Sequence, residues 1–195
     1  IYLESTANQS CVAVQDSFFV QFTPAPTVDA GAGILSCSND PAVTLNGVIG
    51  GATTTGVWTG GSGTFTADST DLNAVYTPTP AEISNGFLFL TLTSTNNLGC
   101  VSETDNVQIE FIAPPTANFS VNDVCQGEQT TFTDFSNIGF GAIDTWQWDF
   151  GVAGGTSVNQ NDVYTYTNPG TYDVELIVTS VHGCSDTITQ QTEVF

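Results

Sequence analysis

The sequence lacks positive charge: among 195 residues it has no lysine and no arginine, against 20 aspartates and glutamates. A chain of this length would on average carry roughly 20 basic residues. The net charge of −20 excludes nucleic acid and anionic membrane surfaces as partners, because both would repel the chain. A soluble, self-repelling surface that attracts divalent cations would explain this composition, and so would selection against trypsin-like cleavage or adaptation to salt.

The groups that usually carry catalysis are also scarce. His182 is the only histidine, and it lies in "SVHGC", next to a cysteine in an expected turn. This position is typical of a solvated loop histidine. The sequence has no nucleophile elbow, no phosphate-binding loop, no HExxH and no EF-hand spacing. We therefore predict that the chain is not an enzyme and that it has no catalytic residues.

Long hydrophobic runs are absent as well. No stretch of 18 apolar residues occurs, so we expect no direct membrane insertion. The chain begins in "IYLEST" without the pattern of a signal peptide. We expect it to be an excised piece of a longer protein, whose other modules would be its neighbours.

What the sequence does contain is an internal repeat. Residues 5–27, "STANQSCVAVQDSFFVQFTPAPT", align without a gap on residues 94–116, "STNNLGCVSETDNVQIEFIAPPT", at an offset of 89 residues. A more divergent copy of this pattern, "LIVTSVHGCSDT", occupies residues 176–187. The chain is therefore expected to contain the tail of one repeat, one whole repeat and a third, diverged repeat.

Proline marks the expected boundaries between these repeats. "FTPAPT" and "FIAPPT" each close an alternating strand with residues that cannot continue a sheet ladder. We predict that residues 1–25 are the C-terminal strands of a preceding immunoglobulin-like repeat, that 26–114 form a complete one and that 115–195 form another. Because the linkers are short and stiff, the modules should form a semi-rigid rod.

Hydrophobic periodicity predicts an all-β fold. "FLFLTLTS" and "YDVELIVTS" alternate large apolar with smaller or polar residues, and Val107, Ile109 and Phe111 alternate in "NVQIEFIA". Only "TPAEIS", around Glu82, resembles a helical turn. About seven short strands per module, separated by turn signals, predict tandem antiparallel β-sandwiches of the immunoglobulin-like kind.

The five cysteines follow the repeat. Two of them flank Trp58 in the middle module and two flank Trp148 in the last, at sequence separations of 63 and 59 positions. A disulfide closing a loop of this size contributes about 4 kcal/mol and indicates an oxidising, extracellular compartment. Zinc is the disfavoured alternative, because there is no CxxC and only one histidine. The predicted disulfides are Cys37–Cys100 and Cys125–Cys184, with the partner of Cys11 outside the chain.

The stretch "DTWQWDFGVAGGTS" at residues 144–157 concentrates aromatic side chains. Trp146, Trp148 and Phe150 fall at alternate positions, so a strand would turn all three to one face. Because Trp148 matches Trp58 in the repeat, we predict that this face is sandwich core. An exposed aromatic platform that stacks on sugars is the alternative.

The same stretch carries a family resemblance. "WQWDFG", "YTYTNPGTYDVELIVTS" and "GCSDT" resemble a PKD domain, whose hallmark is a WDFGDG-type motif followed by a pair of strands, although "GVAGG" replaces the usual Asp-containing turn. The middle module, with "GVWTGGSGTF" and "LTLTSTNNLGC", resembles the immunoglobulin-like repeats of giant Bacteroidota surface proteins, including gliding-motility adhesins. That resemblance implies an extracellular, cell-surface protein exported by type IX secretion.

Two kinds of modification or ligand are further predictions. Calcium is the one ligand that the acidic surface favours, and we predict no other cofactor. "NQS" and "NFS" are glycosylation sequons, and "DTI" resembles the Bacteroidota O-glycosylation motif. The candidate calcium ligands are Asp29, Asp123, Asp144 and Asp149, and the candidate glycosylation sites are Asn8, Asn118 and Thr187.

Together these patterns predict a non-catalytic stalk segment of a secreted cell-surface adhesin or fibre, acting as a semi-rigid, disulfide-stabilised spacer. Its ligand would be an unknown surface or polysaccharide. One alternative is a subunit of an extracellular filament, in which strand edges pair between chains. Another is the accessory carbohydrate-binding region of a secreted hydrolase.

Overall fold

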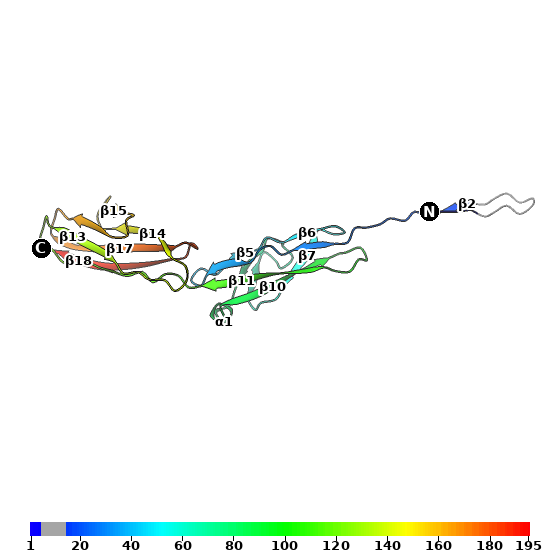
Figure 1. Cartoon of the computed structure of the whole chain (residues 1–195), viewed down its shortest axis with the longest axis horizontal. Helices are drawn as coiled ribbons and strands as arrows, with labels where there is room; N and C mark the ends of the chain where they lie inside the picture. The colour runs from blue at the N-terminus through cyan, green and yellow to red at the C-terminus, as the bar shows by residue number, and fades with distance from the viewer. Residues whose placement is uncertain (5–14) are drawn as a thin grey trace, which may run out of the picture.

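The computed structural model describes residues 1–4 and 15–195 and confirms the predicted fold class, with two β-sandwiches in series. Figure 1 shows an N-terminal hairpin, an extended connection, and then the two sandwiches, here called module 1 (β3 to β11) and module 2 (β12 to β18). The hairpin pairs β1 (Tyr2–Glu4) with β2 (Gln15–Ser17). Cys11 and Asn8 lie outside the described residues.

Module 1 contains two main sheets and a short β3–β6 pair. One sheet has the order β4-β11-β10-β7 and the other β5-β9-β8. All pairs are antiparallel except β4 with β11, which run parallel and place Cys37 beside Ile112. The elements are β3 (Thr27–Asp29), β4 (Ile34–Cys37), β5 (Val43–Thr44), β6 (Val48–Gly50), β7 (Thr55–Thr59), β8 (Thr64–Thr66), β9 (Val75–Thr77), α1 (Pro80–Ser84), β10 (Phe87–Thr95) and β11 (Thr104–Ile112).

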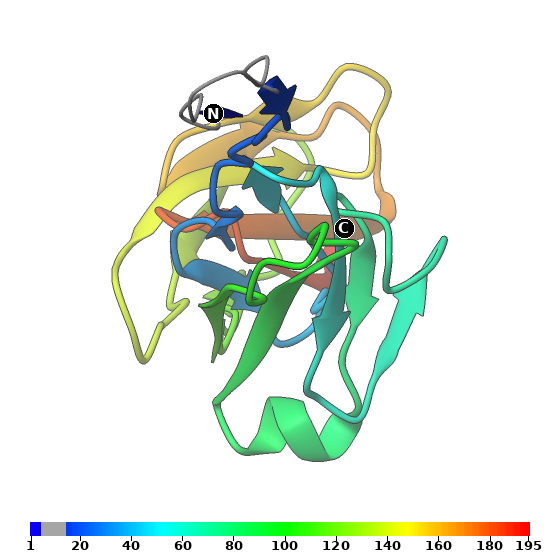
Figure 2. The same ribbon diagram turned by 90° about the vertical axis from the view of Figure 1, so that its right-hand side faces the viewer.

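The helical turn predicted around Glu82 is α1, which Figure 2 shows at the edge of the molecule viewed along its long axis. Thr79 caps its N-terminus, because the Thr79 side chain accepts a hydrogen bond from the Glu82 N–H while the Glu82 carboxylate accepts one from the Thr79 N–H. Pro80 stands at the first helical position, where its missing N–H costs nothing. Local sequence alone therefore specifies this element.

Module 2 is built on two sheets, with strand orders β12-β13-β16 and β15-β14-β17-β18. Its long hairpin β17–β18 pairs Gly170 with Val194 at one end and Thr179 with Ser185 at the other. A parallel bridge between Val124 and Val194 stands where module 1 has its parallel β4–β11 pair. The elements are β12 (Phe119–Ser120), β13 (Gln129–Asp134), β14 (Ile143–Asp149), β15 (Thr156–Ser157), β16 (Asp162–Thr165), β17 (Gly170–Ser180) and β18 (Ser185–Val194).

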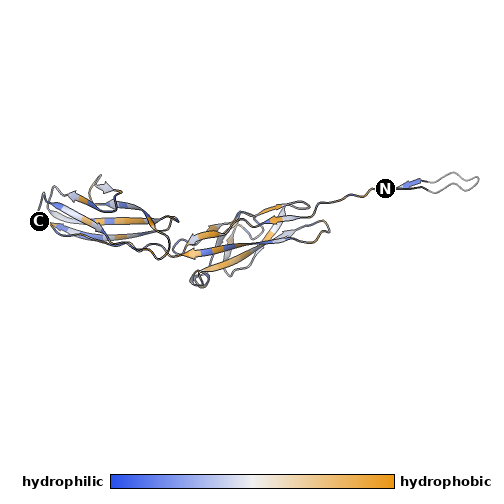
Figure 3. Ribbon diagram, viewed as in Figure 1, coloured by the Kyte–Doolittle hydropathy of each residue, from blue (hydrophilic) through white to orange (hydrophobic). Residues whose placement is uncertain are grey.

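Each module has its own hydrophobic core, and the apolar residues of Figure 3 concentrate on its strands. Val107, Ile109 and Phe111 are buried, as their alternation predicted. The predicted aromatic row of module 2 is also confirmed: Trp148 and Phe150 are buried, and the half-buried Trp146 packs against the same core. Alternating strands thus bury one tryptophan in the core of each sandwich.

Candidate functional site: the junction between the modules

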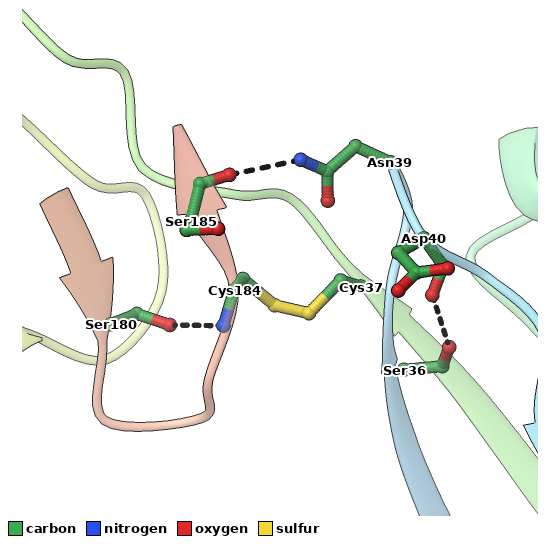
Figure 4. The surroundings of a disulfide bond; sticks show 7 residues. All are labelled: Ser36, Cys37, Asn39, Asp40, Ser180, Cys184 and Ser185. Carbon is green, nitrogen blue, oxygen red and sulfur yellow. Dashed lines mark hydrogen bonds between the residues drawn. A yellow bond between two sulfur atoms is a disulfide. The ribbon is translucent and has the colours of Figure 1, made fainter. Parts of the chain in front are cut away.

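A disulfide between Cys37 and Cys184 joins module 1 to module 2 (Figure 4). Cys37 is the last residue of β4, and Cys184 lies in the turn between β17 and β18. The two Cα atoms are 5.5 Å apart, although the cysteines are separated by 147 residues in the sequence. The junction therefore contains two covalent connections, the peptide linker and this bond.

Hydrogen bonds surround the disulfide on both sides. The Asn39 side chain of module 1 donates to the Ser185 carbonyl of module 2 at 3.0 Å. Within module 2, the Cys184 N–H donates to the Ser180 hydroxyl at 3.1 Å, and Cys184 is 1% exposed. The bond is thus held in a short, ordered turn and shielded from solvent on the Cys184 side.

The peptide linker is fixed to module 2 close by. The Ala117 N–H donates to the Asp186 carboxylate at 2.8 Å, two residues after Cys184. Thr116 and Asn137 exchange a pair of backbone hydrogen bonds of 2.7 and 3.0 Å. Pro115 and Ala117 are buried. These contacts leave the linker few ways to swing, in line with its proline content.

The predicted Cys37–Cys100 disulfide is wrong, and strand direction is the reason. Cys37 lies beside Ile112 at the end of β11, whereas Cys100 lies in the turn that precedes β11. The nine residues of β11 separate the two ends by about 30 Å. A disulfide needs Cα atoms within about 7 Å of each other. The two cysteines therefore occupy opposite ends of module 1.

The predicted Cys125–Cys184 disulfide is wrong for the same reason. Val124 pairs with Val194 at the end of β18, which places Cys125 there, while Cys184 precedes the first residue of that strand. Cys100 and Cys125 form no disulfide within the described part of the chain. Sequence reasoning missed that the two cysteines of each module lie at opposite ends of its sandwich.

An open hollow of about 580 Å³ lies on module 2, and Trp146 forms part of its wall. The indole Nε1 of Trp146 donates to the Asp134 carboxylate at 2.9 Å, which fixes the ring. The side chain of Gln160 also donates to this carboxylate, at 3.1 Å. The wall is made of Asp144, Thr145, Trp146, Gln147, Val158, Asn159 and Gln160.

The candidate calcium ligands are spread over both modules, with Asp29 in module 1 and the other three in module 2. The carboxylates of Asp29, Asp123 and Asp149 each accept a backbone N–H at 2.8 Å, from Gly31, Glu193 and Gly151 respectively. Asp144 stands five residues before Asp149 on β14. Within residues 1–4 and 15–195, no three His, Cys, Asp or Glu side chains gather as a metal site requires. Calcium binding at these positions stays a prediction.

The other single-residue predictions fall on the surface. Asn118 and Thr187 are exposed, as a glycosylated side chain must be, and their modification stays a prediction. His182 is also exposed and stacks on Phe140, with ring centroids 5.3 Å apart. None of the described helices is long and apolar enough to cross a membrane.

The most strongly bonded carboxylate lies in module 1, at Glu82. Burial disfavours its charged form, but the N–H groups of Thr79 and Ser62 and the Tyr76 hydroxyl donate to it and lower its pKa. Burial, followed by the hydrogen bond to Glu82, raises the pKa of Tyr76 to about 12. This network joins α1 to the loop before β8. The hydrogen-bond donors and acceptors of this network satisfy one another, so the network is a structural element of the module.

Comparison with known proteins centres on module 2. The family model described as PKD domain matches residues 112–195. The PKD1 domain of Vibrio anguillarum Epp is 32% identical, covering 42% of this chain and 93% of that one, with a TM-score of 0.38. The PKD1 domain of the Vibrio cholerae metalloprotease PrtV is 34% identical, covering 42% and 96%, with a TM-score of 0.37.

A structure reported for carbohydrate-binding modules of the β-sandwich superfamily is 35% identical to this chain. That match covers 42% of this chain and 34% of the other, with a TM-score of 0.40. No curated protein matches the sequence.

Proposed function

Because residues 112–195 belong to the PKD domain family, we propose that this chain is a non-catalytic, semi-rigid spacer segment of an extracellular protein. The observation that carries the proposal is the Cys37–Cys184 bond, which joins consecutive modules instead of stabilising either one internally. A bond in that place restricts how one sandwich turns against the next. The function of such a bond is to keep the segment extended and oriented.

The proposed location is the surface of a Bacteroidota-like bacterium, in a stalk or adhesin exported by type IX secretion. Disulfides are typical of oxidising, extracellular environments, and the PKD family agrees with that environment. The absence of lysine and arginine gives trypsin-like proteases no cleavage sites. A spacer exposed to the medium benefits from both properties.

We also propose that residues 1–25 are the last strands of another module of this kind. Phe18 and Phe22 are 58% and 89% exposed, whereas the residues that match them in the repeat, Val107 and Phe111, are 1% and 8% exposed. Apolar side chains at core positions of the repeat are normally covered. The exposed pair is therefore what the edge of an incomplete sandwich would present.

The spacer function can be tested by measuring how freely the modules turn. Fluorescent dyes on Cys100 and Cys125, in a Cys11→Ser background, report the distance across both modules. We expect a narrow distribution of energy-transfer efficiency with the disulfide intact and a broader one in Cys37→Ser/Cys184→Ser. The reason is that only the peptide linker and its hydrogen bonds then hold the junction.

Asn39→Ala provides the matched control, because it removes the hydrogen bond to Ser185 and keeps the disulfide. Its distribution should stay narrow. Equally narrow distributions in the double serine variant would show that the disulfide does not set the orientation. A broad distribution in the unchanged chain would contradict the spacer proposal itself.

Carbohydrate binding by module 2 is a second candidate, and the hollow at Trp146 favours it. Carboxylate, amide and indole groups line this hollow, and sugars are bound by such polar groups beside an aromatic ring. The test is retardation of the protein in gels containing cellulose, chitin or xylan derivatives. Trp146→Ala should abolish any retardation, while Phe140→Ala, outside the hollow, should keep it. Unretarded migration in every gel would count against this candidate.

A further inference from the structure

Cys125 stands in module 2 where Cys37 stands in module 1. The residue after Cys37 donates its N–H to the carbonyl of Ile112, at the end of the last strand of module 1, at 2.9 Å. The residue after Cys125 donates to the carbonyl of Phe195 in the same way, at 2.8 Å. Both cysteines thus lie beside the residue from which the chain leaves its module.

The turns that follow the two cysteines also match. The Asp40 N–H donates to the Cys37 carbonyl at 3.1 Å, and the Glu128 N–H donates to the Cys125 carbonyl at 3.0 Å. Backbone geometry at the exit end of module 2 therefore reproduces the geometry that already holds a disulfide in module 1. The side chain of Cys125 is exposed.

The entry ends of the two modules match as well. In module 2, the Ala117 N–H donates to Asp186 at 2.8 Å; in module 1, the Ala30 N–H donates to Asp105 at 2.8 Å. Each aspartate follows the hairpin turn that carries a cysteine, Cys184 in one case and Cys100 in the other. The turn of Cys100 is longer, and Cys100 is only partly buried within it.

Apolar side chains are exposed beside Cys100, at the entry end of module 1. Leu98 and Val101 are 76% and 82% exposed there. Val181, in the turn that carries the bonded Cys184, is less exposed, at 54%. This exposure is a second reason, independent of the thiol, to expect another module against the entry end of module 1.

We propose that Cys125 forms a disulfide with the hairpin cysteine of a further module of the same kind that follows Phe195, and that Cys100 forms the reciprocal bond with a preceding module. Consecutive modules would then be joined at every junction as modules 1 and 2 are. Formation of each bond removes one proton and one electron from each thiol. The two electrons pass to the disulfide of a protein thiol oxidant, which becomes a dithiol. The inference rests on the proposed spacer function.

The native full-length chain provides the direct test. It is alkylated with iodoacetamide under denaturing, non-reducing conditions and cut by a glutamate-specific protease, since trypsin has no site in residues 1–195. Glu82, Glu103, Glu128 and Glu175 separate the four described cysteines. We expect the Cys125 peptide to be linked to a peptide from a later module. Its alkylation should be at least tenfold lower than in the isolated 195-residue chain.

A tandem chain tests the geometry without knowledge of the flanking sequence. Residues 26–195 are placed directly after Phe195, so that Ala30 of the second copy follows Phe195 by five residues, as Ala117 follows Ile112. We expect a bond from Cys125 of the first copy to Cys100 of the second. Cys125→Ser in the first copy should leave that Cys100 free to alkylate and Cys37–Cys184 intact.

Two outcomes would overturn the inference. One is a fully alkylated Cys125 in a native chain that does carry a later module. The other is a folded tandem chain, with Cys37–Cys184 formed, in which Cys125 and Cys100 stay unlinked. Both would leave the spacer function standing, because that function is tested by the orientation of modules 1 and 2.

Discussion

Modules 1 and 2 share a backbone framework and differ in what fills it. In both, an aspartate on the second strand of a hairpin accepts a hydrogen bond from the first segment of the module. Both also bury one tryptophan, whose indole N–H donates to a loop carbonyl at 3.3 Å for Trp58 and 2.8 Å for Trp148. Around Trp148, module 2 places an aromatic cluster. Around Trp58, module 1 places mostly aliphatic residues and adds the buried Glu82 network. The two modules therefore share these hydrogen bonds but not the residues that fill their cores.

The largest effect should come from the two tryptophans. Trp58→Ala and Trp148→Ala should each lower the free energy of unfolding of their own module by about 3–5 kcal/mol, because a large buried side chain is lost. The loss should be greater at Trp148, which contacts Phe119 and Phe132 at centroid distances of 5.0 and 5.7 Å. Calorimetry should show one transition shifted down by roughly 15 °C or more and the other unchanged.

The control for this comparison is Trp146→Ala, which should cost less because the ring is half-buried. If both transitions moved together in either tryptophan variant, the two modules would unfold as one unit and the comparison between them would fail.

A smaller effect, confined to module 1, is expected from Glu82→Gln. The variant keeps the shape of the side chain but loses charge-assisted hydrogen bonds, at a cost of about 2 kcal/mol. Because the folded-state pKa of Glu82 lies below its usual value of 4.5, the carboxylate contributes its stabilisation above that pH. This contribution is lost as the pH falls through the lower, folded-state pKa.

Thermal unfolding between pH 7 and pH 3 measures this contribution. The module 1 transition should fall less steeply with acid in Glu82→Gln than in the unchanged chain, and the module 2 transition should fall equally in both. Glu110→Gln, on an exposed position of β11, is the matched control and should change little. Parallel curves for the unchanged chain and Glu82→Gln would refute the role of this carboxylate.

The smallest effect should come from the aspartates that fix the first segment of each module. Asp105→Ala and Asp186→Ala each leave one backbone N–H without its acceptor, at Ala30 and Ala117, and should cost about 1 kcal/mol. Amide hydrogen exchange at these two alanines should accelerate in the matching variant only. Unchanged exchange rates would show that neither bond is needed. Asp186→Ala should also broaden the dye-distance distribution slightly, because Ala117 belongs to the linker.

Local sequence patterns predicted most of this framework. The alternation in β10, β11 and β17 predicted strands because burial on one face of a strand has period two. The stretch "TPAEIS" predicted a helical turn, and the contacts that cap α1 span only three residues. The match of Trp58 to Trp148 correctly predicted two buried rings. Each of these features depends on residues close together in the sequence or on the repeat itself.

The partner of Cys37 could not be predicted in this way. A disulfide inside each module and a disulfide at each junction both require two cysteines per module, at the same spacing in the sequence. The positions of the cysteines alone therefore do not distinguish the two arrangements. Only the parallel pairing of β4 with β11 shows that Cys37 stands at the exit end and Cys100 at the entry end. The Tyr76–Glu82 network was missed for a similar reason, since a loop remote in the sequence provides the Ser62 and Gly63 N–H groups that complete it.

The Cys37–Cys184 bond also determines the path of mechanical tension. When the two ends of the chain are pulled apart, the shortest covalent route passes from residue 37 directly to residue 184. The 147-residue loop between them carries no load through its own backbone. If both sandwiches were to unfold under force, roughly 500 Å of chain would remain unextended, at about 3.4 Å per residue. The bond therefore limits how far the segment can be stretched. A backbone break between these cysteines would leave the segment in one piece.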